Sequence, residues 1–374
     1  MNLTIVHVGK YKPDNANGVN KTIVGLCDSL KTYKNYQIEV WNFGKNKNIE
    51  EYYIDNIKII NLPKRKINLL NSIFPPIKTS QYLRKRSSEI SLFHFHSVFI
   101  PINVWLKSFG VKYIITPNGG YSKKVLFGKK KFLKFLWMKF FEKSFVENAS
   151  AIHAVSDSEL SELDKVFRSD KKFVLPNGLE NSLVLKNKLM PENKKMIFIG
   201  RMAINQKGLD ILIESYMNSC ERCNGDIYDL YLIGPDFRNN TDMLKKFIIN
   251  KRYRKKIKFI GPLYGEERFR YFTSINFFVH TSRWEGLPFS LLEALGKGQP
   301  ALITPETNIA NYVKKYNAGI VVNGDIDSVT DALIEIKNLS NEELVKMSKN
   351  AVQLISENFL WENITSKLVK EYNK

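Results

Sequence analysis

Two glutamates eight positions apart, Glu285 and Glu293, mark the segment of this sequence that is richest in candidate chemistry. They belong to HTSRWEGLPFSLLEALGKGQPALIT, residues 280–304, where a strand-like run is followed by a loop and a predicted helix. Pro288 suits the first turn of that helix. The helix N-terminus offers a diphosphate its dipole and several backbone N–H groups, which are those of Gly286, Leu287, Phe289 and Ser290. The two carboxylates can then accept hydrogen bonds from sugar hydroxyls on either side of the anion. The alternative is one loop charge and one exposed helix residue.

The segment IGRMAINQKGLD, residues 199–210, supplies two cations for the same chemistry. A predicted strand ends in Gly200, and Arg201 follows at its carboxyl end, where open α/β sheets bind ligands. Lys207 precedes Gly208 at the start of the next predicted helix. A guanidinium and an ammonium group can together stabilise a pyrophosphate leaving group without a metal ion. Alone, the two residues are equally compatible with surface cations, but the glutamates in the same predicted domain favour the functional interpretation.

Alternating strand-like and helix-like runs position these residues and predict two parallel-sheet α/β domains. The predicted strands are 3–8, 36–43, 57–62, 91–98, 112–118, 151–156, 195–200, 230–234, 256–261, 275–280, 300–304 and 318–323. The predicted helices include 208–219, 288–297 and 341–356. A length of 374 residues also favours two domains. We therefore expect a Rossmann-like domain over 1–180, a polar linker over 181–194, a second Rossmann-like domain over 195–356 and a last helix within 357–374.

Composition excludes several classes of protein. Apolar residues at 44% and charged residues at 25% are ordinary for a globular chain and argue against a disordered, collagen-like or coiled-coil chain. The sequence contains no run of 18 apolar residues, so no membrane-spanning helix is predicted. The N-terminus lacks the pattern of a signal peptide. Three cysteines fit a reducing compartment. Cys220 and Cys223 have no second cysteine or histidine pair near them, so no metal site is predicted. We expect a cytoplasmic protein.

The positive charge is unusual in both size and distribution. The chain carries 57 Lys and Arg against 37 Asp and Glu, a net charge of +20. Residues 57–143 contain 18 of the Lys and Arg but only two acidic residues, Glu89 and Glu142. Most of the net charge therefore lies in this segment, which predicts an anionic partner for it.

Within this segment, residues 121–143 read YSKKVLFGKKKFLKFLWMKFFEK, in which lysines alternate with aromatic and aliphatic residues. As one helix this stretch is amphipathic, basic and aromatic, which is typical of a helix lying on a membrane surface. We predict contact with anionic lipid through Lys129, Lys130, Lys131, Lys134 and Trp137. A packed helix with a solvated lysine face is one alternative. Binding of single-stranded nucleic acid is another alternative, although no recognised nucleic-acid-binding motif accompanies the stretch. No nucleic acid is expected as a partner.

Together these segments resemble the family 4 glycosyltransferases, which are retaining, nucleotide-sugar-dependent enzymes of the GT-B fold. The GxR…KG pattern is matched by Gly200, Arg201, Lys207 and Gly208, and the EGxPxxLLEA pattern by residues 285–294. VLPNG at 174–178 is similar to the family's interdomain turn, and FLWENIT at 359–365 to the start of its last helix. The resemblance covers nearly the whole chain. It implies two Rossmann-like domains facing a cleft, with the last helix returning to the N-terminal domain.

The resemblance also implies roles for individual residues. Arg201 and Lys207 would stabilise the diphosphate, Glu293 would accept from the ribose hydroxyls, and Glu285 would accept from the hydroxyls of the transferred sugar. The remaining donor-binding residues implied by the resemblance are Gly18, Gly200, Ile260, Leu263, Gly286, Leu287, Pro288 and Phe289. Gly18 corresponds to the family's glycine-rich turn, where relatives often have two glycines and this chain has Asn17 before Gly18.

On the acceptor side the sequence departs from the family. Many relatives have His or Arg before Gly after the fifth strand, but this chain has Asn118 in TPNGG, and Asn cannot act as a base near neutral pH. His96, in HFHS at 94–97, is a candidate acceptor contact, although His residues at alternate strand positions are more often sheet residues. In retaining enzymes of this type the leaving phosphate can itself accept the acceptor proton, so no protein base is required.

The sequence thus predicts transfer of a sugar, with retention, from a UDP- or GDP-linked donor to a lipid-linked glycan. A bacterial pathway for O-antigen, capsule or lipopolysaccharide is the expected setting, with the enzyme held peripherally at the inner face of the cell membrane. No cofactor and no metal ion are expected. Two alternatives remain at this point: a nucleic-acid-binding protein, and a related nucleotide-sugar epimerase or phosphorylase.

Overall fold

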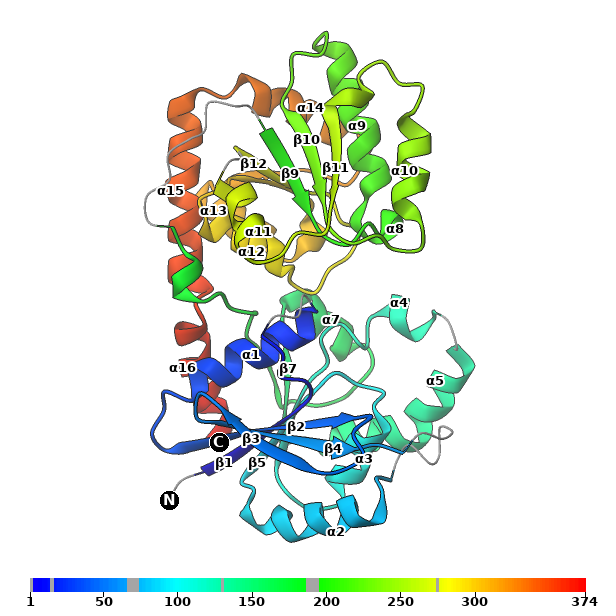
Figure 1. Cartoon of the computed structure of the whole chain (residues 1–374), viewed down its shortest axis with the longest axis vertical. Coiled ribbons are helices and arrows are strands. Elements are labelled where there is room, and N and C mark those ends of the chain that lie inside the picture. Colours follow the sequence, from blue (N-terminus) through cyan, green and yellow to red (C-terminus); the bar gives the residue numbers. More distant parts are fainter. Residues whose placement is uncertain (1–2, 14–16, 66–73, 129–130, 186–194, 274–275) are drawn as a thin grey trace. The chain divides into compact units, whose positions relative to one another are not determined.

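A computed structural model of the chain describes residues 3–13, 17–65, 74–128, 131–185, 195–273 and 276–374. The chain forms two compact units (Figure 1). Unit 1 comprises Met1–Gly178 together with Trp361–Lys374, and unit 2 comprises Leu179–Leu360. The last helix, α16 (Trp361–Tyr372), therefore belongs to the unit formed by the N-terminal half of the chain.

Unit 1 contains an eight-stranded sheet in the order β3-β4-β2-β1-β5-β6-β7-β8. Its strands are β1 (Leu3–Val8), β2 (Tyr36–Gly44), β3 (Glu50–Ile54), β4 (Ile57–Pro63), β5 (Leu92–His96), β6 (Tyr113–Thr116), β7 (Ala151–Ala154) and β8 (Lys172–Val174). All neighbours are parallel except β3 and β4. The sequence analysis missed β3, because its residues EEYYI lie mostly exposed at the sheet edge and lack the apolar pattern of a buried strand.

Alternate residues of the central strands of unit 1 pack on different helices. Val6 and Phe95 point into a core completed by helices α3 (Pro101–Lys107), α5 (Lys131–Trp137), α6 (Lys143–Glu147) and α7 (Asp157–Asp164). A further helix, α2 (Ile77–Arg86), contributes the buried Leu83 to this core. Helix α1 (Gly18–Leu30) instead packs against α16. A Cβ atom added at Gly25 of α1 would lie 2.0 Å from the indole nitrogen of Trp361, so glycine permits this close helix contact.

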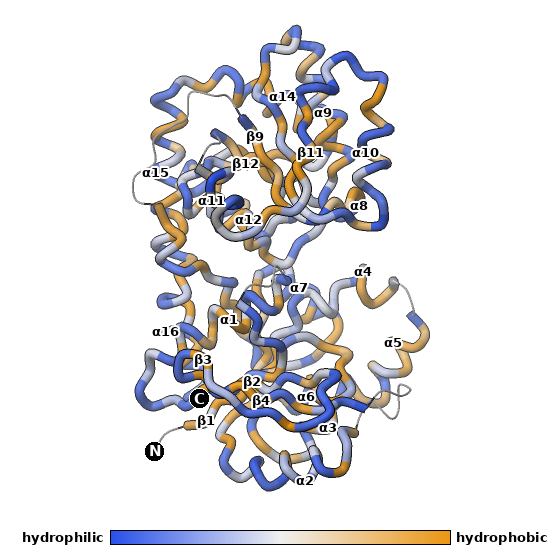
Figure 2. The backbone as a smooth tube through the Cα atoms, in the orientation of Figure 1, coloured by the Kyte–Doolittle hydropathy of each residue, from blue (hydrophilic) through white to orange (hydrophobic). Residues whose placement is uncertain are grey.

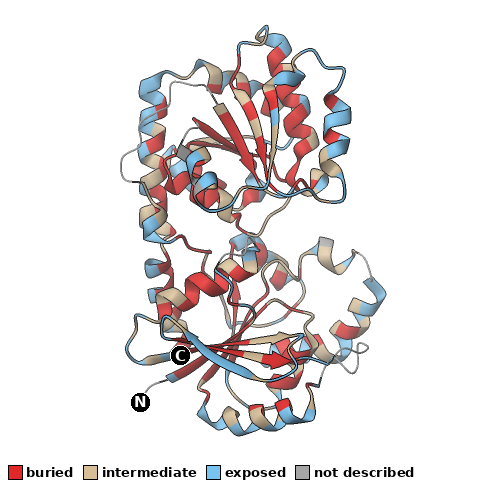
Figure 3. Cartoon of the chain, viewed as in Figure 1, coloured by how far each residue is buried: buried red, intermediate tan, exposed pale blue. Residues whose placement is uncertain are grey.

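Unit 2 contains a six-stranded, fully parallel sheet in the order β11-β10-β9-β12-β13-β14. Its strands are β9 (Lys195–Ile199), β10 (Asp229–Ile233), β11 (Ile257–Gly261), β12 (Phe277–His280), β13 (Ala301–Ile303) and β14 (Gly319–Val321). All six lie within the predicted strands or differ from them by a residue or two at the ends. The four inner strands are mainly apolar and mainly buried, as β9 illustrates (Figures 2 and 3), whereas the edge strands β11 and β14 are mainly partly exposed.

The helices of unit 2 cover both faces of its sheet. They are α8 (Ile204–Lys207), α9 (Leu209–Arg222), α10 (Asn240–Ile248), α11 (Gly265–Thr273), α12 (Phe289–Gly296), α13 (Ala310–Tyr316), α14 (Ile326–Asn338) and α15 (Asn341–Asn358). Met196 and Phe198 of β9 pack with α9, α10 and α14, whereas Ile197 and Ile199 pack with α12, α13 and α15. This alternation is the pattern expected of a parallel strand covered on both sides.

The predicted linker is partly packed. Leu183 and Val184 lie against the core of unit 2, and the N–H of Leu185 donates to the carbonyl oxygen of Gly296. Residues 186–194 lie outside the described part of the chain. At the other end of unit 2, the boundary with the last helix falls between Leu360 and Trp361, four residues beyond the expected position.

The single helix predicted over 121–143 is wrong. The structure has α4 (Lys123–Leu126), α5, a π-helical turn (Met138–Glu142) and α6 in this region. α5, the π turn and α6 follow one another without a break, and at the π turn the buried carboxylate of Glu142 accepts hydrogen bonds from the Phe99 N–H, the Tyr121 hydroxyl and the Trp137 indole N–H at 2.9, 2.7 and 2.6 Å. A π turn aligns residues five positions apart, and it brings Trp137 onto this carboxylate.

Candidate active site

The end of β9 places the two predicted cations differently. Gly200 directly follows the strand, Arg201 comes next as an exposed residue, and Lys207 lies at the end of α8 with only 8% of its surface exposed. Gly208 has a φ of +59°, and a Cβ there would lie 2.1 Å from the carbonyl oxygen of Thr281. Only glycine therefore fits the junction of α8 and α9 at this distance from the end of β12.

Lys207 and Glu285 form a buried ion pair. The Nζ of Lys207 lies 2.5 Å from Oε1 of Glu285, and the side chains are 10% and 9% exposed. The same oxygen accepts from the Ser282 hydroxyl at 2.7 Å and lies 3.3 Å from Nε2 of His280. Although burial raises the pKa of Glu285, the hydrogen bond from His280 and the charge of Lys207 lower it to about 2. Glu285 is therefore a fixed carboxylate at neutral pH.

The loop that carries Glu285 is held at two points. Arg283 forms a bidentate ion pair with Asp210 of α9, with nitrogen–oxygen distances of 2.8 and 2.7 Å. Nδ2 of Asn308 donates to the carbonyl oxygens of Glu285 and Gly286, at 2.7 Å each. These contacts fix the loop at the start of α12, and they pre-organise it for a ligand.

The N-terminus of α12 lies directly after this loop. Its N-cap is Pro288, and no described side chain caps the helix there. Leu287 and Pro288 are buried, whereas Gly286 and Phe289 are partly exposed. Leu287 packs into the core, so a contact between this residue and a donor would involve its backbone.

Glu293 is buried one turn further along α12. Its side chain is 8% exposed and forms an ion pair with the guanidinium of Arg268 on α11. The alternative that Glu285 and Glu293 are a loop charge and an exposed helix residue is therefore wrong. The sequence analysis did not identify Arg268, His280 or Asn308 as neighbours of this site. His280 opens the segment that the analysis singled out, so its position at a strand end was a usable signal.

Arg201 has other contacts. Its guanidinium carbon lies 5.3 Å from the ring centre of Phe237, and Nη2 lies 3.3 Å from Oε1 of Gln206. No described interaction joins Arg201 to Lys207 or Glu285. Arg201 is exposed, and its predicted contact with a diphosphate stays a prediction.

Ile260 lies in β11 and Leu263 two residues beyond its end, and neither lines the cavity of about 350 Å³ at this edge of the sheet, although their neighbours Phe259, Gly261 and Pro262 do. Both are partly buried and pack against the core of unit 2. The cavity is formed at the carboxyl ends of β10 and β11, and its lining includes Met202, Gly234, Asp236, Phe259, Gly261 and Pro262. This is the edge of a parallel sheet at which ligands bind.

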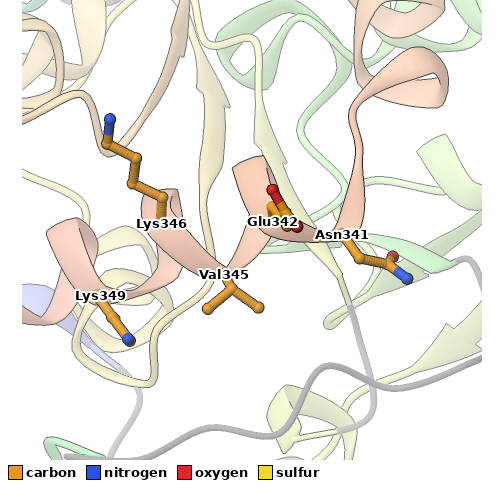
Figure 4. A pocket seen from close by; sticks show the side chains of 5 residues that line it. All are labelled: Asn341, Glu342, Val345, Lys346 and Lys349. Atoms are coloured by element: carbon orange, nitrogen blue, oxygen red, sulfur yellow. The ribbon is translucent and has the colours of Figure 1, made fainter.

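A second hollow, of about 400 Å³, lies on α15 (Figure 4). All of its lining residues belong to that one helix: Asn341, Glu342, Val345, Lys346 and Lys349. It shares none of them with the site at the strand ends, and it belongs to the open surface of the helix.

The sequence analysis also predicted site residues in unit 1. Gly18 is exposed at the first turn of α1, where the Asn17 side chain caps the helix by accepting from the N–H of Asn20 at 3.3 Å. Asn118 is partly exposed, has a φ of +53°, and donates through Nδ2 to the carbonyl oxygen of Thr116 at 3.1 Å. These positions follow the ends of strands β1 and β6.

His96 belongs to a cluster of buried histidines. Ring nitrogens of His7, His94 and His96 lie within 4.8 Å of one another, which raises the question of a metal site. However, Nδ1 of His7 and Nε2 of His96 are 2.9 Å apart, and the two nitrogens of His94 lie 2.6 Å from the Tyr372 hydroxyl and 2.7 Å from the Thr116 hydroxyl. This cluster is a hydrogen-bonded network in the described structure. His96 is 2% exposed, and its predicted contact with an acceptor stays a prediction.

The predicted membrane residues separate into exposed and packed groups. Lys131 is exposed, whereas Trp137 is 7% exposed and packed in the core of unit 1, which corrects its expected place on the surface. Nζ of Lys134 donates to the carbonyl oxygen of Val125 at 2.5 Å. Lys129 and Lys130 lie outside the described residues. Among the described helices, none is both long and apolar enough to cross a bilayer.

Comparison with known proteins decides the family. Residues 16–182 match the family described as "Glycosyltransferase Family 4", and residues 184–354 match "Glycosyl transferases group 1". The chain is a family 4 glycosyltransferase. Its fold is GT-B. The glycosyltransferase superposes on sucrose-phosphate synthase from Thermosynechococcus elongatus with a TM-score of 0.75 at 16% identity. The superposition covers 99% of this chain and 98% of the synthase chain.

Two curated relatives of this glycosyltransferase are named for lipid-linked acceptors. It is 19% identical, over 71% of its length and 68% of the relative, to GDP-mannose:cellobiosyl-diphosphopolyprenol alpha-mannosyltransferase from Xanthomonas campestris. It is 23% identical, over 83% and 82%, to UDP-Gal:alpha-D-GlcNAc-diphosphoundecaprenol alpha-1,3-galactosyltransferase from Escherichia coli.

Proposed function

We propose that this glycosyltransferase moves a sugar, with retention, from a UDP- or GDP-linked donor to a glycan carried on a polyprenyl diphosphate. The observation that carries the proposal is the buried Lys207–Glu285 pair, in which Glu285 lies in the loop that leads into the N-terminus of α12. The names of both relatives describe a nucleotide-linked donor and a lipid-linked acceptor. This supports the same substrate classes for the present glycosyltransferase. Assembly of a bacterial surface polysaccharide, such as O-antigen, capsule or lipopolysaccharide, is the proposed setting.

The chemistry follows from the charges. The bond between the sugar C1 and the β-phosphate oxygen breaks, the acceptor oxygen bonds to C1, and the acceptor proton passes to an oxygen of the leaving phosphate. Lys207, Arg201 and the N–H groups at the start of α12 stabilise the negative charge that develops on the diphosphate. No protein base is needed. We propose that these cations replace a metal ion, so treatment with EDTA should leave activity intact.

The two glutamates have distinct proposed roles. Glu285, ionised and held by Lys207 and Ser282, accepts from hydroxyls of the transferred sugar close to the positive charge that develops at C1. Glu293 accepts from the ribose hydroxyls, which are bound equally in the ground state and the transition state. Glu285→Gln should therefore mainly lower kcat, and Glu293→Gln should mainly weaken donor binding.

We also propose that unit 1 binds an anionic membrane surface at the inner face of the cell membrane. Five large apolar side chains project from α4, α5 and the π turn: Phe127, Phe132, Leu133, Phe135 and Phe140, of which the least exposed is 49% exposed. Lys123, Lys131, Lys139 and Lys143 are exposed among them. Exposed aromatic residues beside lysines suit the headgroup zone of a bilayer.

One panel tests the donor class. The protein is incubated with UDP-, GDP- and dTDP-sugars, and thermal shift and donor hydrolysis are measured. We expect one nucleotide class to stabilise the protein and to be hydrolysed slowly, and Glu285→Gln to reduce hydrolysis. Glu306→Gln is the control, because Glu306 is an exposed glutamate in the same unit. Formation of a glycosidic bond on a polyprenyl-diphosphate glycan then separates a transferase from an epimerase. Binding of oligonucleotides with no response to any nucleotide sugar would contradict the proposal.

A further inference from the structure

Two helices of unit 2 present matched pairs of side chains around Glu293. Helix α11 contributes Arg268 and Phe272, four positions apart, and α12 contributes Glu293 and Lys297, also four positions apart. Side chains at this spacing lie on one face of a helix. Arg268 is paired with Glu293, and its guanidinium carbon lies 5.3 Å from the ring centre of Phe272. Nζ of Lys297 lies 5.9 Å from the same ring.

This arrangement gives the carboxylate of Glu293 its counter-charge. The Glu293 side chain is 8% exposed, and an ionised carboxylate at such burial requires a cation close by. Burial is the largest influence on Lys297 and lowers its pKa to about 8, while Glu293 raises that pKa and Arg268 lowers it. A guanidinium remains charged throughout the physiological range. Arg268 is a cation in direct contact with the Glu293 carboxylate.

The guanidinium also fixes the direction of the carboxylate. Arg268 Nη2 binds Oε2 of Glu293, and the stacking on Phe272, which is 1% exposed, holds the guanidinium plane. The ion pair with a guanidinium that is itself held in place restricts the rotamers that Glu293 can adopt, so less entropy is lost when a ligand hydroxyl binds.

We propose that Arg268 is a positioning residue of the donor site, which holds Glu293 ionised and oriented for the ribose hydroxyls of the nucleotide. This inference rests on the proposed function, in which Glu293 accepts from ribose. It adds a residue that lies outside the two motifs in the sequence, and it predicts that the effect of Arg268 on binding passes through the 2′- and 3′-hydroxyls. An arginine that instead competed with ribose for Glu293 would weaken binding, and its removal would strengthen it.

The test compares nucleotides with and without these hydroxyls. Isothermal titration calorimetry on the full chain measures Kd for UDP, GDP and their 2′,3′-dideoxy forms. For the nucleotide that binds, the unaltered protein should prefer the ribose form by roughly 10- to 100-fold, as expected for hydrogen bonds to a charged group. In Arg268→Ala the affinity for the ribose form should fall, the affinity for the dideoxy form should change little, and the preference should shrink toward that of Glu293→Gln.

Further variants separate positioning from folding. Arg268→Lys should restore part of the preference, and Arg268→Ala combined with Glu293→Gln should bind no more weakly than Glu293→Gln alone, because both changes remove the same interaction. Arg222→Ala is the matched control, since Arg222 forms an exposed ion pair with Asp331 in the same unit. Thermal unfolding of each variant reports on folding, and Arg268→Gln replaces Arg268→Ala where the latter lowers Tm markedly.

The outcomes distinguish the two levels of the argument. Equal loss of affinity for ribose and dideoxy nucleotides in Arg268→Ala would overturn the inference and leave the proposed function standing. An unchanged or increased preference of this variant for the ribose form would have the same consequence. If the unaltered protein binds neither nucleotide, the proposed function fails, and the inference fails with it.

Discussion

Nζ of Lys207 lies 2.5 Å from Oε1 of Glu285, although 78 positions separate the two residues in the sequence. Lys207 ends α8, the helix that follows β9, and Glu285 lies in the loop after β12; β9 and β12 are neighbours in the sheet. The pair joins the two motifs that the sequence presents separately. It also means that Lys207 already has one anionic partner. A diphosphate bound here would therefore share the positive charge of Lys207 with Glu285.

The first prediction separates the two cations. Lys207→Ala should lower kcat/KM by about 100- to 1,000-fold, which is the effect of losing one stabilising contact in a desolvated site. It should also lower Tm, because Glu285 would remain buried without its cation. Arg201→Ala should reduce kcat/KM as well but leave Tm unchanged, since Arg201 is exposed. Steady-state kinetics and thermal unfolding provide both readouts, with Arg222→Ala as the control. Near-normal kcat/KM in both variants would remove these residues from the site.

The second prediction concerns acid stability. The pKa of Glu285 is about 2 in the folded protein, against an ordinary value of 4.5. The folded state therefore binds fewer protons than the unfolded state between these values, and the ionised carboxylate contributes stability above pH 4.5 that is lost as the pH falls toward 2. The contribution is on the order of 3 kcal/mol. Glu285→Gln should lower stability at pH 7 and flatten its decline in acid. Urea unfolding from pH 3 to pH 7 measures this, and parallel pH profiles for both proteins would count against it.

The third prediction concerns the last helix. Gly25→Ala should destabilise unit 1 by about 1–3 kcal/mol, because the new Cβ would lie 2.0 Å from the Trp361 indole nitrogen and the contact between α1 and α16 would have to open. Gly324→Ala is the matched control, since its Cβ would meet only Thr304 Cγ2 at 3.5 Å. Denaturant unfolding measures both, and equal stability of the two variants would show that the helix contact adapts without cost.

The site shows what sequence patterns can and cannot provide. Local patterns located Lys207, Glu285 and Glu293 because each lies at a strand end or on a short helix with a recognisable motif. Arg268 carries no such signal: α11 was not predicted, and the ion pair to Glu293 depends on how two helices pack. Packing of this kind is decided by tertiary contacts, which one sequence does not reveal.

The same limit applies to the basic stretch over 121–143. Its composition correctly indicated apolar side chains beside lysines, but the sequence could not show which of them pack. Trp137 turns inward because the π turn brings it to Glu142, whereas Phe132, Phe135 and Phe140 remain exposed.

The last prediction tests whether the exposed residues of α5 and the π turn bind lipid. Phe132→Ser, Phe135→Ser and Phe140→Ser in one protein should reduce co-sedimentation with anionic vesicles, since each of these rings is at least 63% exposed. Removing exposed aromatic rings should not harm folding. Donor hydrolysis should persist, because the proposed donor residues other than Gly18 lie in unit 2 and none of the three rings belongs to them.

A second variant tests the contribution of charge separately. Lys123, Lys131 and Lys139 changed together to Glu should release the protein from anionic vesicles, and the binding of the unaltered protein should fall steeply with salt because exposed charges are screened within about 10 Å at 0.1 M ionic strength. The matched control changes Lys314, Lys346 and Lys349 to Glu, an equal charge change on exposed residues of unit 2. If only the variants of unit 1 lose binding, the apolar and basic residues act together as a membrane surface. If the control loses binding equally, attraction depends on net charge alone and these residues have no special role. If neither lysine variant releases the protein, lipid is the wrong partner, and binding of single-stranded nucleic acid is the measurement that follows.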